Sequence, residues 1–135
     1  MIEVVIADHQ ELFQAGLVEV LSVVEDVRIV GTARSPEQLV STLEKANPHV
    51  LVLSTNFLPV LPKIQRMLKR RRTSLLLLGE DNDQVDYMKW LRAHGIVYRS
   101  VDVPVLLDAM RRVAGSELFL QDLSSDMGKD KFDVA

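Results

Sequence analysis

The sequence predicts an α/β fold, an open, doubly wound sheet of five parallel strands with helices on both faces. Two observations lead to this prediction. Short apolar runs alternate five times with longer amphipathic segments. Most of these runs are apolar nearly throughout, as strands covered on both faces must be. Because right-handed crossovers place the connecting helices on both faces, a functional site is expected at the carboxyl ends of the strands.

Five apolar runs are the expected strands. They are Ile2–Ala7, Val27–Thr32, Val50–Ser54, Leu75–Gly79 and Ile96–Arg99. The central runs do not alternate with polar residues, which indicates strands buried on both sides. Each run is followed by a segment with apolar residues at helical spacing, so the chain consists of five consecutive strand and helix units.

Five helical stripes follow the strands in order. The first contains Leu12, Phe13, Gly16, Leu17, Val20 and Leu21. The later stripes are Leu39, Val40 and Leu43; Ile64, Met67 and Leu68; Val85, Met88 and Leu91; and Leu106, Leu107, Met110 and Val113. At the start of the second helix, Ser35-Pro36-Glu37-Gln38 supplies an N-cap, a first-turn proline and a capping-box glutamine. Asn47-Pro48 ends that helix, and Asp102 with Pro104 opens the fifth.

Length and composition indicate one globular domain without disulfides. The chain has 135 residues, 47% hydrophobic and 26% charged, close to the globular average. The absence of cysteine excludes a disulfide framework and thiol chemistry. We expect the domain to span residues 1–120, and the more polar residues 121–135 to form a tail or linker. There is no secretory leader pattern and no apolar run of membrane-spanning length, which predicts a cytoplasmic protein.

The charge balance argues against a domain devoted to nucleic acid. The chain carries 16 basic and 19 acidic residues, a net charge of −3. The run Lys69-Arg70-Arg71-Arg72 ends a predicted helix, where cations complement the partial negative charge of the C-terminus, so we interpret it as a solvated helix end. His9, His49 and His94 have no ligand-like spacing, so no zinc site is expected. We expect no cofactor and no membrane contact.

Polar residues gather where the expected strands end. In order they are Asp8 and His9; Thr32; Ser54, Thr55 and Asn56; Gly79, Glu80 and Asp81; and Arg99 to Asp102. With the segments VVIADHQELFQAGL, NPHVLVLS, LRAHGIVY and VPVLLDAMRRVAGSELFL, residues 1 to 120 resemble the receiver domain of two-component response regulators. The resemblance is to receivers that precede a helix-turn-helix domain in the NarL/LuxR group. It implies a flavodoxin-like (βα)5 receiver fold with strand order 2-1-3-4-5.

The resemblance implies a degenerate phosphorylation site. A receiver of the usual kind accepts a phosphoryl group on an aspartate after its third strand, with Mg²⁺ held by an acidic pair after the first. Here only Asp8 is retained, while the second acid falls on His9, the acceptor on Ser54, the switch hydroxyl on Gly79 and the lysine on Val101. Each loss removes a metal ligand, the carboxylate for an acyl phosphate, or a phosphate contact. Tyr98 keeps the position of the aromatic residue that moves with the switch hydroxyl.

Two of these residues have other interpretations. Asp8 is either a relic acid solvated at the strand end, which we favour, or a cation ligand together with Glu80, Asp81 or Glu11. Ser54 as a nucleophile would need His9 as its base across the strand ends, and no G-x-S-x-G elbow surrounds it. Gln10 stands where an Asp-X-Asp phosphatase needs its second acid. We therefore do not expect an enzyme.

Surplus apolar residues beside two core stripes indicate a contact with another chain. Val18 and Val105 lie next to the stripes of the first and fifth helices. They form a candidate interface with Arg111 or Arg112 on its rim. Tyr87 and Trp90 of the fourth helix are further candidates, for which an interface and a core position are equally expected.

Together these observations predict a phosphorylation-independent pseudo-receiver, a regulatory and dimerisation module of a two-component-type transcription regulator. We expect a homodimer, with another signalling protein as a further candidate partner. DNA contact is expected only through a separate helix-turn-helix domain beyond this chain. The alternative function is a receiver-like domain switched by a small-molecule ligand bound at the carboxyl ends of the strands.

Overall fold

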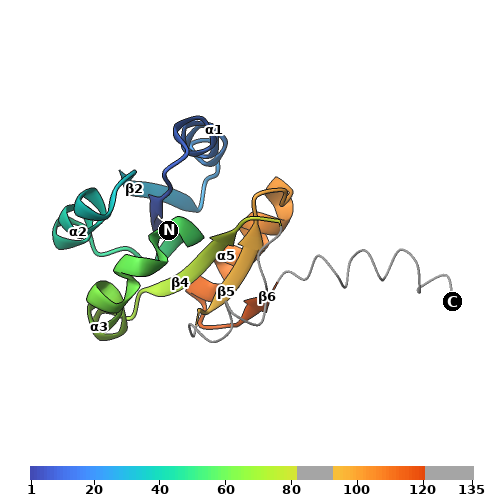
Figure 1. Ribbon diagram of the computed structural model, residues 1–135. Coiled ribbons are helices and arrows are strands. Elements are labelled where there is room, and N and C mark those ends of the chain that lie inside the picture. Colours follow the sequence, from blue (N-terminus) through green and yellow to red (C-terminus); the bar gives the residue numbers. More distant parts are fainter. Residues whose placement is uncertain (82–92, 121–135) are drawn as a thin grey trace, which may run out of the picture.

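The protein folds around a parallel sheet with helices on both faces (Figure 1). The computed structural model describes residues 1–81 and 93–120. The sheet order is β2-β1-β3-β4-β5-β6, and each of these neighbouring pairs is parallel. The predicted doubly wound architecture and the order 2-1-3-4-5 are confirmed.

The strands lie close to their predicted positions. They are β1 Ile2–Ala7, β2 Val27–Ala33, β3 Val50–Ser54, β4 Ser74–Gly79, β5 Gly95–Tyr98 and β6 Phe119–Leu120. The helices are α1 Glu11–Leu21, α2 Pro36–Lys45, α3 Leu61–Arg71 and α5 Val103–Ala114. The predicted stripe of Val85, Met88 and Leu91 lies outside the described residues. No helix in the described ranges is long and apolar enough to cross a membrane.

Two elements were not predicted from the sequence. A 3-10 helix, η1 Thr55–Val60, connects β3 to α3. The short strand β6 adds a sixth strand to the sheet, with Phe119 opposite Gly95 and Leu120 opposite Ile96. A two-residue strand carries no periodicity that a sequence pattern could detect.

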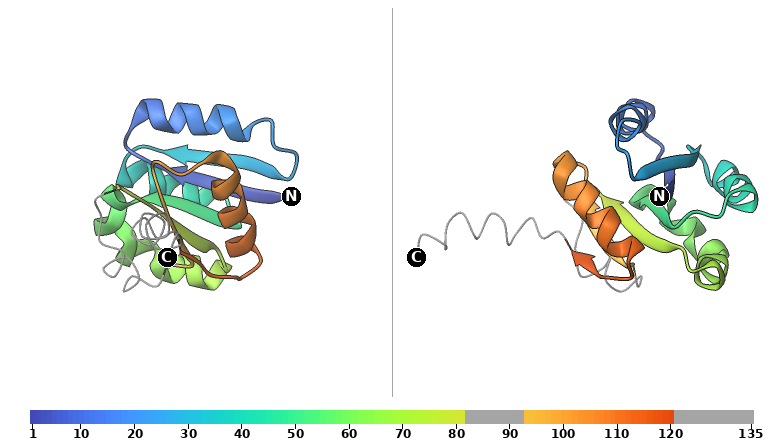
Figure 2. Two further views of the ribbon diagram at one scale, coloured as in Figure 1. Left: turned by 90° about the vertical axis from the view of Figure 1, so that its right-hand side faces the viewer. Right: turned by 180° about the vertical axis from the view of Figure 1, so that it is seen from behind.

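Helices cover both faces of the sheet (Figures 1 and 2), and the core consists of two apolar layers, one on each face. On one face, Leu39 and Leu43 of α2 and Ile64 and Leu68 of α3 pack against the strands. On the other face the packing residues are Leu21 of α1 and Leu106, Ala109, Met110 and Val113 of α5. All five residues of β3 are buried, because this strand is covered by both layers. The strand ends are therefore held at fixed positions along one edge.

The start of α2 follows the predicted capping pattern. The Ser35 hydroxyl accepts a hydrogen bond from the N–H of Gln38 at 3.2 Å. The Gln38 side chain reaches back to the N–H of Arg34 at 2.8 Å, one residue before the cap. These bonds satisfy N–H groups that the first turn leaves without partners. At α5, Asp102 takes the N-cap position without a side-chain capping bond.

Two glycines allow a matched test of this packing. A Cβ atom on Gly95 would lie 2.8 Å from side-chain atoms of Leu76 and Val113 and 3.0 Å from the carbonyl oxygen of Phe119. On Gly16 of α1, a Cβ atom would meet nothing within 4 Å. We expect Gly95→Ala to lower the free energy of unfolding by about 1 to 3 kcal/mol through overpacking. Gly16→Ala should raise it by about 0.5 to 1 kcal/mol, because alanine favours a helix interior.

Urea denaturation followed by circular dichroism measures both changes. A Gly95→Ala protein as stable as the parent would show that β5 is not clamped between β4, α5 and β6.

Candidate functional site

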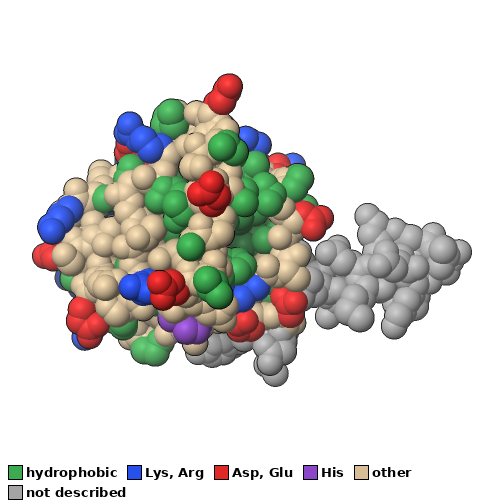
Figure 3. All heavy atoms as spheres, turned by 90° about the horizontal axis from the view of Figure 1, so that it is seen from above, with side chains coloured by type: hydrophobic (Ala, Val, Ile, Leu, Met, Phe, Trp, Pro, Cys, Tyr) green, Lys and Arg blue, Asp and Glu red, His purple; other side chains and the backbone are tan. Residues whose placement is uncertain are grey.

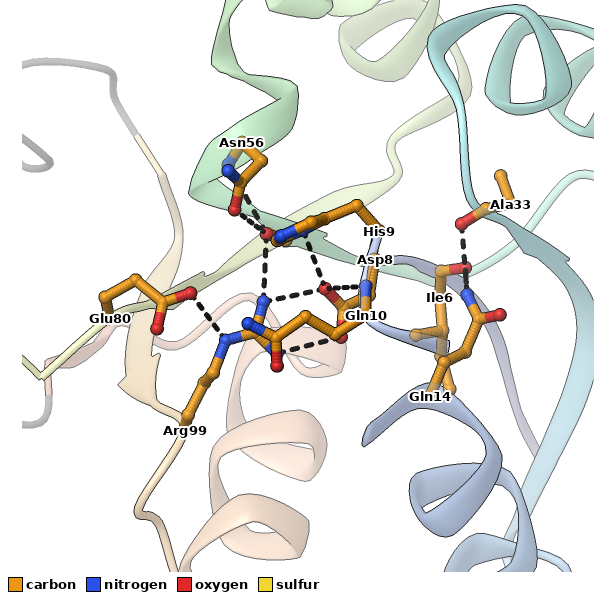
Figure 4. A network of polar contacts seen from close by, with 10 residues as sticks. Ile6, Asp8, His9, Gln10, Gln14, Ala33, Asn56, Glu80 and Arg99 are labelled. Atoms are coloured by element: carbon orange, nitrogen blue, oxygen red, sulfur yellow. Dashed lines mark hydrogen bonds and ion pairs between the residues drawn. The ribbon is translucent and has the colours of Figure 1, made fainter. Parts of the chain in front are cut away.

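Four charged or polar side chains converge where β1, β3, β4 and β5 end. Asp8 follows β1, Ser54 ends β3, Glu80 follows β4 and Arg99 follows β5. Figure 4 shows the guanidinium of Arg99 between Asp8 on one side and Glu80 on the other. Because parallel strands end at the same edge, residues separated by up to 91 positions in the chain become neighbours.

The ion pair of Arg99 with Asp8 is the centre of this site. One terminal guanidinium nitrogen of Arg99 lies 2.8 Å from Oδ2 of Asp8, and the other lies 2.7 Å from Oδ1. The two parallel bonds form the bidentate arrangement that a planar guanidinium makes with a carboxylate. The Asp8 side chain is 0% exposed and that of Arg99 is 11% exposed. The pair is therefore buried and charge-compensated.

Arg99 uses its remaining donors on two other strand ends. Its Nε donates to Oε1 of Glu80 at 2.6 Å, and Nη2 also approaches Oγ of Ser54 at 3.3 Å. The guanidinium carbon lies 4.7 Å from the ring centroid of Phe13 in α1, within the range of a cation–π contact. Hydrogen bonding to Asp8 is the main cause that raises the pKa of Arg99 above its ordinary value. The side chain is a permanent cation.

Asp8 is not the solvated relic acid that we favoured from the sequence. Besides Arg99, its Oδ1 accepts from the backbone N–H of Gln10 at 3.3 Å and lies 3.5 Å from Nδ1 of His9. Its own N–H donates to the carbonyl oxygen of Ala33 at 3.0 Å. A carboxylate removed from water requires such partners, so the acid is structural to this edge of the sheet.

Asp8 forms no cation site with the acids proposed from the sequence. Glu80 binds Arg99, Asp81 accepts the hydroxyl of Ser100 at 3.0 Å, and Glu11 pairs with Arg34 at 3.0 Å. The described residues contain no group of three His, Cys, Asp or Glu side chains that could hold a metal ion.

Ser54 is engaged in a local turn. Its hydroxyl lies 3.1 Å from Oδ1 of Asn56 and accepts from the N–H of Asn56 at 3.3 Å. Ser54 is 0% exposed, and His9 makes its polar contact with Asp8. The arrangement is that of a helix cap at the start of η1 and provides no nucleophile with a base.

Val101, the position to which the resemblance assigned the lost lysine, lies apart from this cluster. Val101 is half-buried and packs against the apolar layer of α1 and α5. The cation of the site is Arg99, the residue directly after β5. The signal for this residue in the sequence is an arginine at the carboxyl end of an otherwise apolar run. The sequence analysis included Arg99 among the polar residues at the strand ends but assigned it no role.

Gly79 and Tyr98 end β4 and β5 side by side. The carbonyl oxygen of Gly79 accepts the N–H of Arg99 at 3.1 Å, which fixes the backbone of Arg99 beside β4. Tyr98 is 1% exposed and belongs to the apolar layer that α2 and α3 cover. Its ring is directed into the core, on the other side of the sheet from Val101.

Gln14 of α1 is a further polar residue that the sequence analysis missed. It is 7% exposed, and its Nε2 donates to the carbonyl oxygens of Ile6 at 3.2 Å and Ala33 at 3.0 Å. These bonds tie α1 to the ends of β1 and β2, next to Asp8 (Figure 4). The available signal was a polar residue on the buried side of an apolar stripe, since buried polar groups are normally hydrogen-bonded.

The residues of the candidate interface lie on α1 and α5, as far as the structure describes them. Val18 and Val105 are half-buried, and Val18 packs against the core layer. Arg111 pairs with Asp26, and Arg112 pairs with Asp108 and Glu117. Hydrogen bonding to Arg111 lowers the pKa of Asp26 below its ordinary value. Tyr87 and Trp90 lie outside the described residues.

Known proteins similar to this chain are response regulators. DegU of Brevibacillus brevis, a transcriptional regulatory protein, is 25% identical over 122 residues, which cover 84% of this chain and 50% of DegU. The nitrate/nitrite response regulator NarL of Escherichia coli K12 is 23% identical over 125 residues, 88% of this chain and 57% of NarL. The chain thus spans about half the length of these relatives. No protein-family model matches the chain.

Solved receiver domains have the same fold. The non-phosphorylated receiver domain of RcsB from Escherichia coli superposes with a TM-score of 0.78 at 21% identity, covering 90% of this chain and 98% of that domain. The RcsB receiver of Salmonella enterica in its apo form also gives 0.78, covering 96% and 99%. The predicted similarity to response-regulator receivers is confirmed by these relatives and neighbours.

A double-mutant cycle on Asp8 and Arg99 tests the buried pair. Asp8→Asn leaves the guanidinium without its main partner, and Arg99→Met leaves a buried carboxylate without one. We expect each single change to lower the free energy of unfolding by about 3 kcal/mol, because an unpaired buried charge is costly. The double variant should lose clearly less than the two single losses together.

The matched control is the same cycle on Asp26 and Arg111, an exposed pair of the same type. Its coupling should be much smaller, because solvent screens exposed charges. Additive losses at Asp8 and Arg99 would contradict the assignment of a coupled buried pair.

Proposed function

We propose that this domain is a phosphorylation-independent pseudo-receiver, a regulatory and dimerisation module. The observation that carries the proposal is the guanidinium of Arg99, which binds Asp8, Glu80 and Ser54 at the edge of the sheet where a receiver carries its phosphorylation chemistry. The chain would be the receiver part of a transcription regulator, as the names of its relatives suggest. DNA recognition would then reside in a separate helix-turn-helix domain.

The residues present do not supply the chemistry of phosphoryl transfer. An acyl phosphate requires a carboxylate, and Ser54 ends β3 with a hydroxyl that caps the next turn. Mg²⁺ requires several oxygen ligands in near-octahedral array, and the carboxylate of Asp8 is already neutralised by Arg99. A metal ion could reach Asp8 only by displacing a bidentate, buried guanidinium. This displacement would leave the cation of Arg99 without its main partner.

The same contacts favour a single resident conformation. Arg99, which follows β5, contacts Asp8 after β1, Ser54 at the end of β3 and Glu80 after β4. In a receiver that switches, the hydroxyl of a residue after the fourth strand moves toward a phosphoryl oxygen. Gly79 stands at that position and has no hydroxyl group. Tyr98 is buried in the core. A permanent cation thus holds together the strand ends that a phosphoryl group and Mg²⁺ would otherwise bridge.

Incubation with acetyl phosphate and Mg²⁺ tests this proposal. We expect no phosphoryl adduct by intact-mass spectrometry, and Ser54→Asp alone should not restore efficient phosphorylation, since Arg99 would still occupy Asp8. The receiver domain of NarL treated in parallel controls for the reagent. An acid-labile adduct at Asp8, or an acid-stable one at Ser54, formed at high occupancy would contradict the proposal.

We further propose that the domain forms a homodimer through the face of α1 and α5. Apolar side chains gather around a hollow on the side of the molecule seen from above α1 (Figure 3). On these helices Leu12 is 88%, Val20 36% and Val103 41% exposed. Exposed apolar surface of this kind is energetically unfavourable unless another chain covers it. Among the structural neighbours are two RcsB dimers bound to two parallel DNAs, an assembly that a twofold face would suit.

Charge substitutions on this face test the dimer. Leu12→Lys and Val103→Lys should each weaken self-association at least about tenfold, because a twofold contact contains every substitution twice and loses about 1 to 2 kcal/mol of burial at each copy. Analytical ultracentrifugation measures the dissociation constant. Leu118→Lys is the matched control, since Leu118 is 71% exposed and lies outside both helices.

A monomeric parent at high concentration, or equal effects of all three substitutions, would rule out this face. The alternative of a small-molecule switch at the strand ends gains no support from the structure, because Arg99 fills the space between the carboxylates with its own side chain.

A further inference from the structure

Basic residues are concentrated on one helix of an acidic domain. Residues 61–72, α3 and its C-cap, hold six of the 16 lysines and arginines of the chain and none of its 19 acids. Five of the six are exposed to solvent: Lys63, Arg66, Lys69, Arg70 and Arg72. We call these five residues the α3 basic face. The rest of the chain holds 10 basic and 19 acidic residues, so positive charge is concentrated on this helix.

The cations of the α3 basic face differ from the other arginines that the structure describes. Arginines elsewhere in the described ranges each pair with a carboxylate: Arg28, Arg34, Arg99, Arg111 and Arg112. The α3 basic face makes no ion pair or hydrogen bond with any described side chain. Its five positive charges are therefore available to a partner.

The helix C-terminus explains only part of this arrangement. Cations in the last turn complement the partial negative charge there, which accounts for Lys69 and Arg70. Lys63 lies in the first turn, where the partial charge is positive and acids are favoured, and that turn has no acid. Arg66 lies three residues from Lys63 and four from Arg70, spacings at which like charges repel on a helix. A solvated helix end thus explains the cations of the last turn but not Lys63 and Arg66.

The α3 basic face stands on a rigid support. The opposite side of α3 buries Leu61, Ile64 and Leu68 in the core. The sixth cation, Arg71, donates to the carbonyl oxygens of Leu43 and Ala46 and so fastens the end of α3 to the end of α2. The basic side chains consequently extend from a helix with a fixed position and need little ordering to bind.

We propose that the α3 basic face binds the phosphate backbone of nucleic acid without reading its sequence. A protein partner would be held by buried apolar or aromatic anchors, and an anionic membrane by inserted apolar residues. The apolar side of α3 is committed to the core, so the exposed side offers charge without anchors. Phosphate contacts require charge alone, and they position a protein without specifying bases.

The dimensions fit this partner. Lys63, Arg66 and Arg70 follow one another along the helix over about 10 Å, at a rise of 1.5 Å per residue. That distance corresponds to about three nucleotides of one strand in duplex DNA. The acidic remainder of the domain would repel the duplex and so orient the encounter toward α3. Because α3 lies across the sheet from α1 and α5, binding there leaves the proposed dimer face free (Figures 1 and 2).

This inference goes beyond the proposed function and does not depend on it. Fluorescence anisotropy with a labelled duplex of about 20 base pairs and arbitrary sequence tests it on the 135-residue chain. We expect weak binding at about 50 mM NaCl that is lost by about 200 mM, with a slope of log K against log salt near −4 for four or five contacts. A second duplex of unrelated sequence should bind equally.

The triple variant Lys63→Gln, Arg66→Gln, Arg70→Gln should bind at least about tenfold more weakly and flatten the slope by about 3, roughly one per lost phosphate contact. The control variant carries Arg28→Gln and Arg34→Gln, at two exposed arginines outside α3. It should change the affinity for the duplex less than about twofold. Circular dichroism checks that all variants are folded.

Three results would overturn the inference. The first is no binding of the parent at low salt, and the second is equal affinity of the parent and the triple variant. The third is binding to vesicles of phosphatidylserine and phosphatidylcholine through these three residues while the duplex does not bind, which would assign the α3 basic face to a membrane surface instead.

Discussion

The buried carboxylate of Asp8 is the constraint on which the functional edge of the sheet depends. A side chain with no exposure to water cannot remain ionised without a counter-charge and hydrogen bonds. Arg99 supplies both, and its other donors then bring Glu80 and Ser54 into the same cluster. Four strand ends are thereby linked through one guanidinium. Buried pairs add little net stability over apolar residues of the same size, so the visible effect of this one is to hold the strand ends next to one another.

The fold does not rely on the chemistry at this edge. Its stability resides in the two apolar layers on the faces of the sheet, built from residues such as Leu39, Leu43, Leu106 and Met110. The strand ends carry side chains that these layers do not use. Phosphorylation chemistry can therefore be lost while the receiver fold is kept, provided that a buried acid left behind finds a new partner. Arg99 binds Asp8 and, under the proposed function, is that partner.

Sequence patterns predicted the strands, whose residue types are set by burial. They missed the contacts between side chains that lie far apart in the sequence. Ile2–Ala7 and Val50–Ser54 were predicted with their observed bounds, because strands buried on both sides are apolar nearly throughout. The role of Arg99 was missed, since its partner Asp8 is 91 residues away and periodicity does not report side-chain direction. The cation of the site directly follows β5, which ends at Tyr98, whereas the resemblance had directed attention to Val101. The sixth strand is too short to leave a pattern.

If this domain is the phosphorylation-independent pseudo-receiver proposed above, it must be regulated by something other than its phosphorylation state. If the α1 and α5 face pairs two copies, the balance of monomer and dimer follows protein concentration by mass action. The faces available for partners then lie on opposite layers, with apolar side chains on α1 and α5 and cations on α3. Two copies paired through α1 and α5 would each turn α3 outward. The cations of α3 would thus lie at the periphery of the assembly, away from the contact between the two copies.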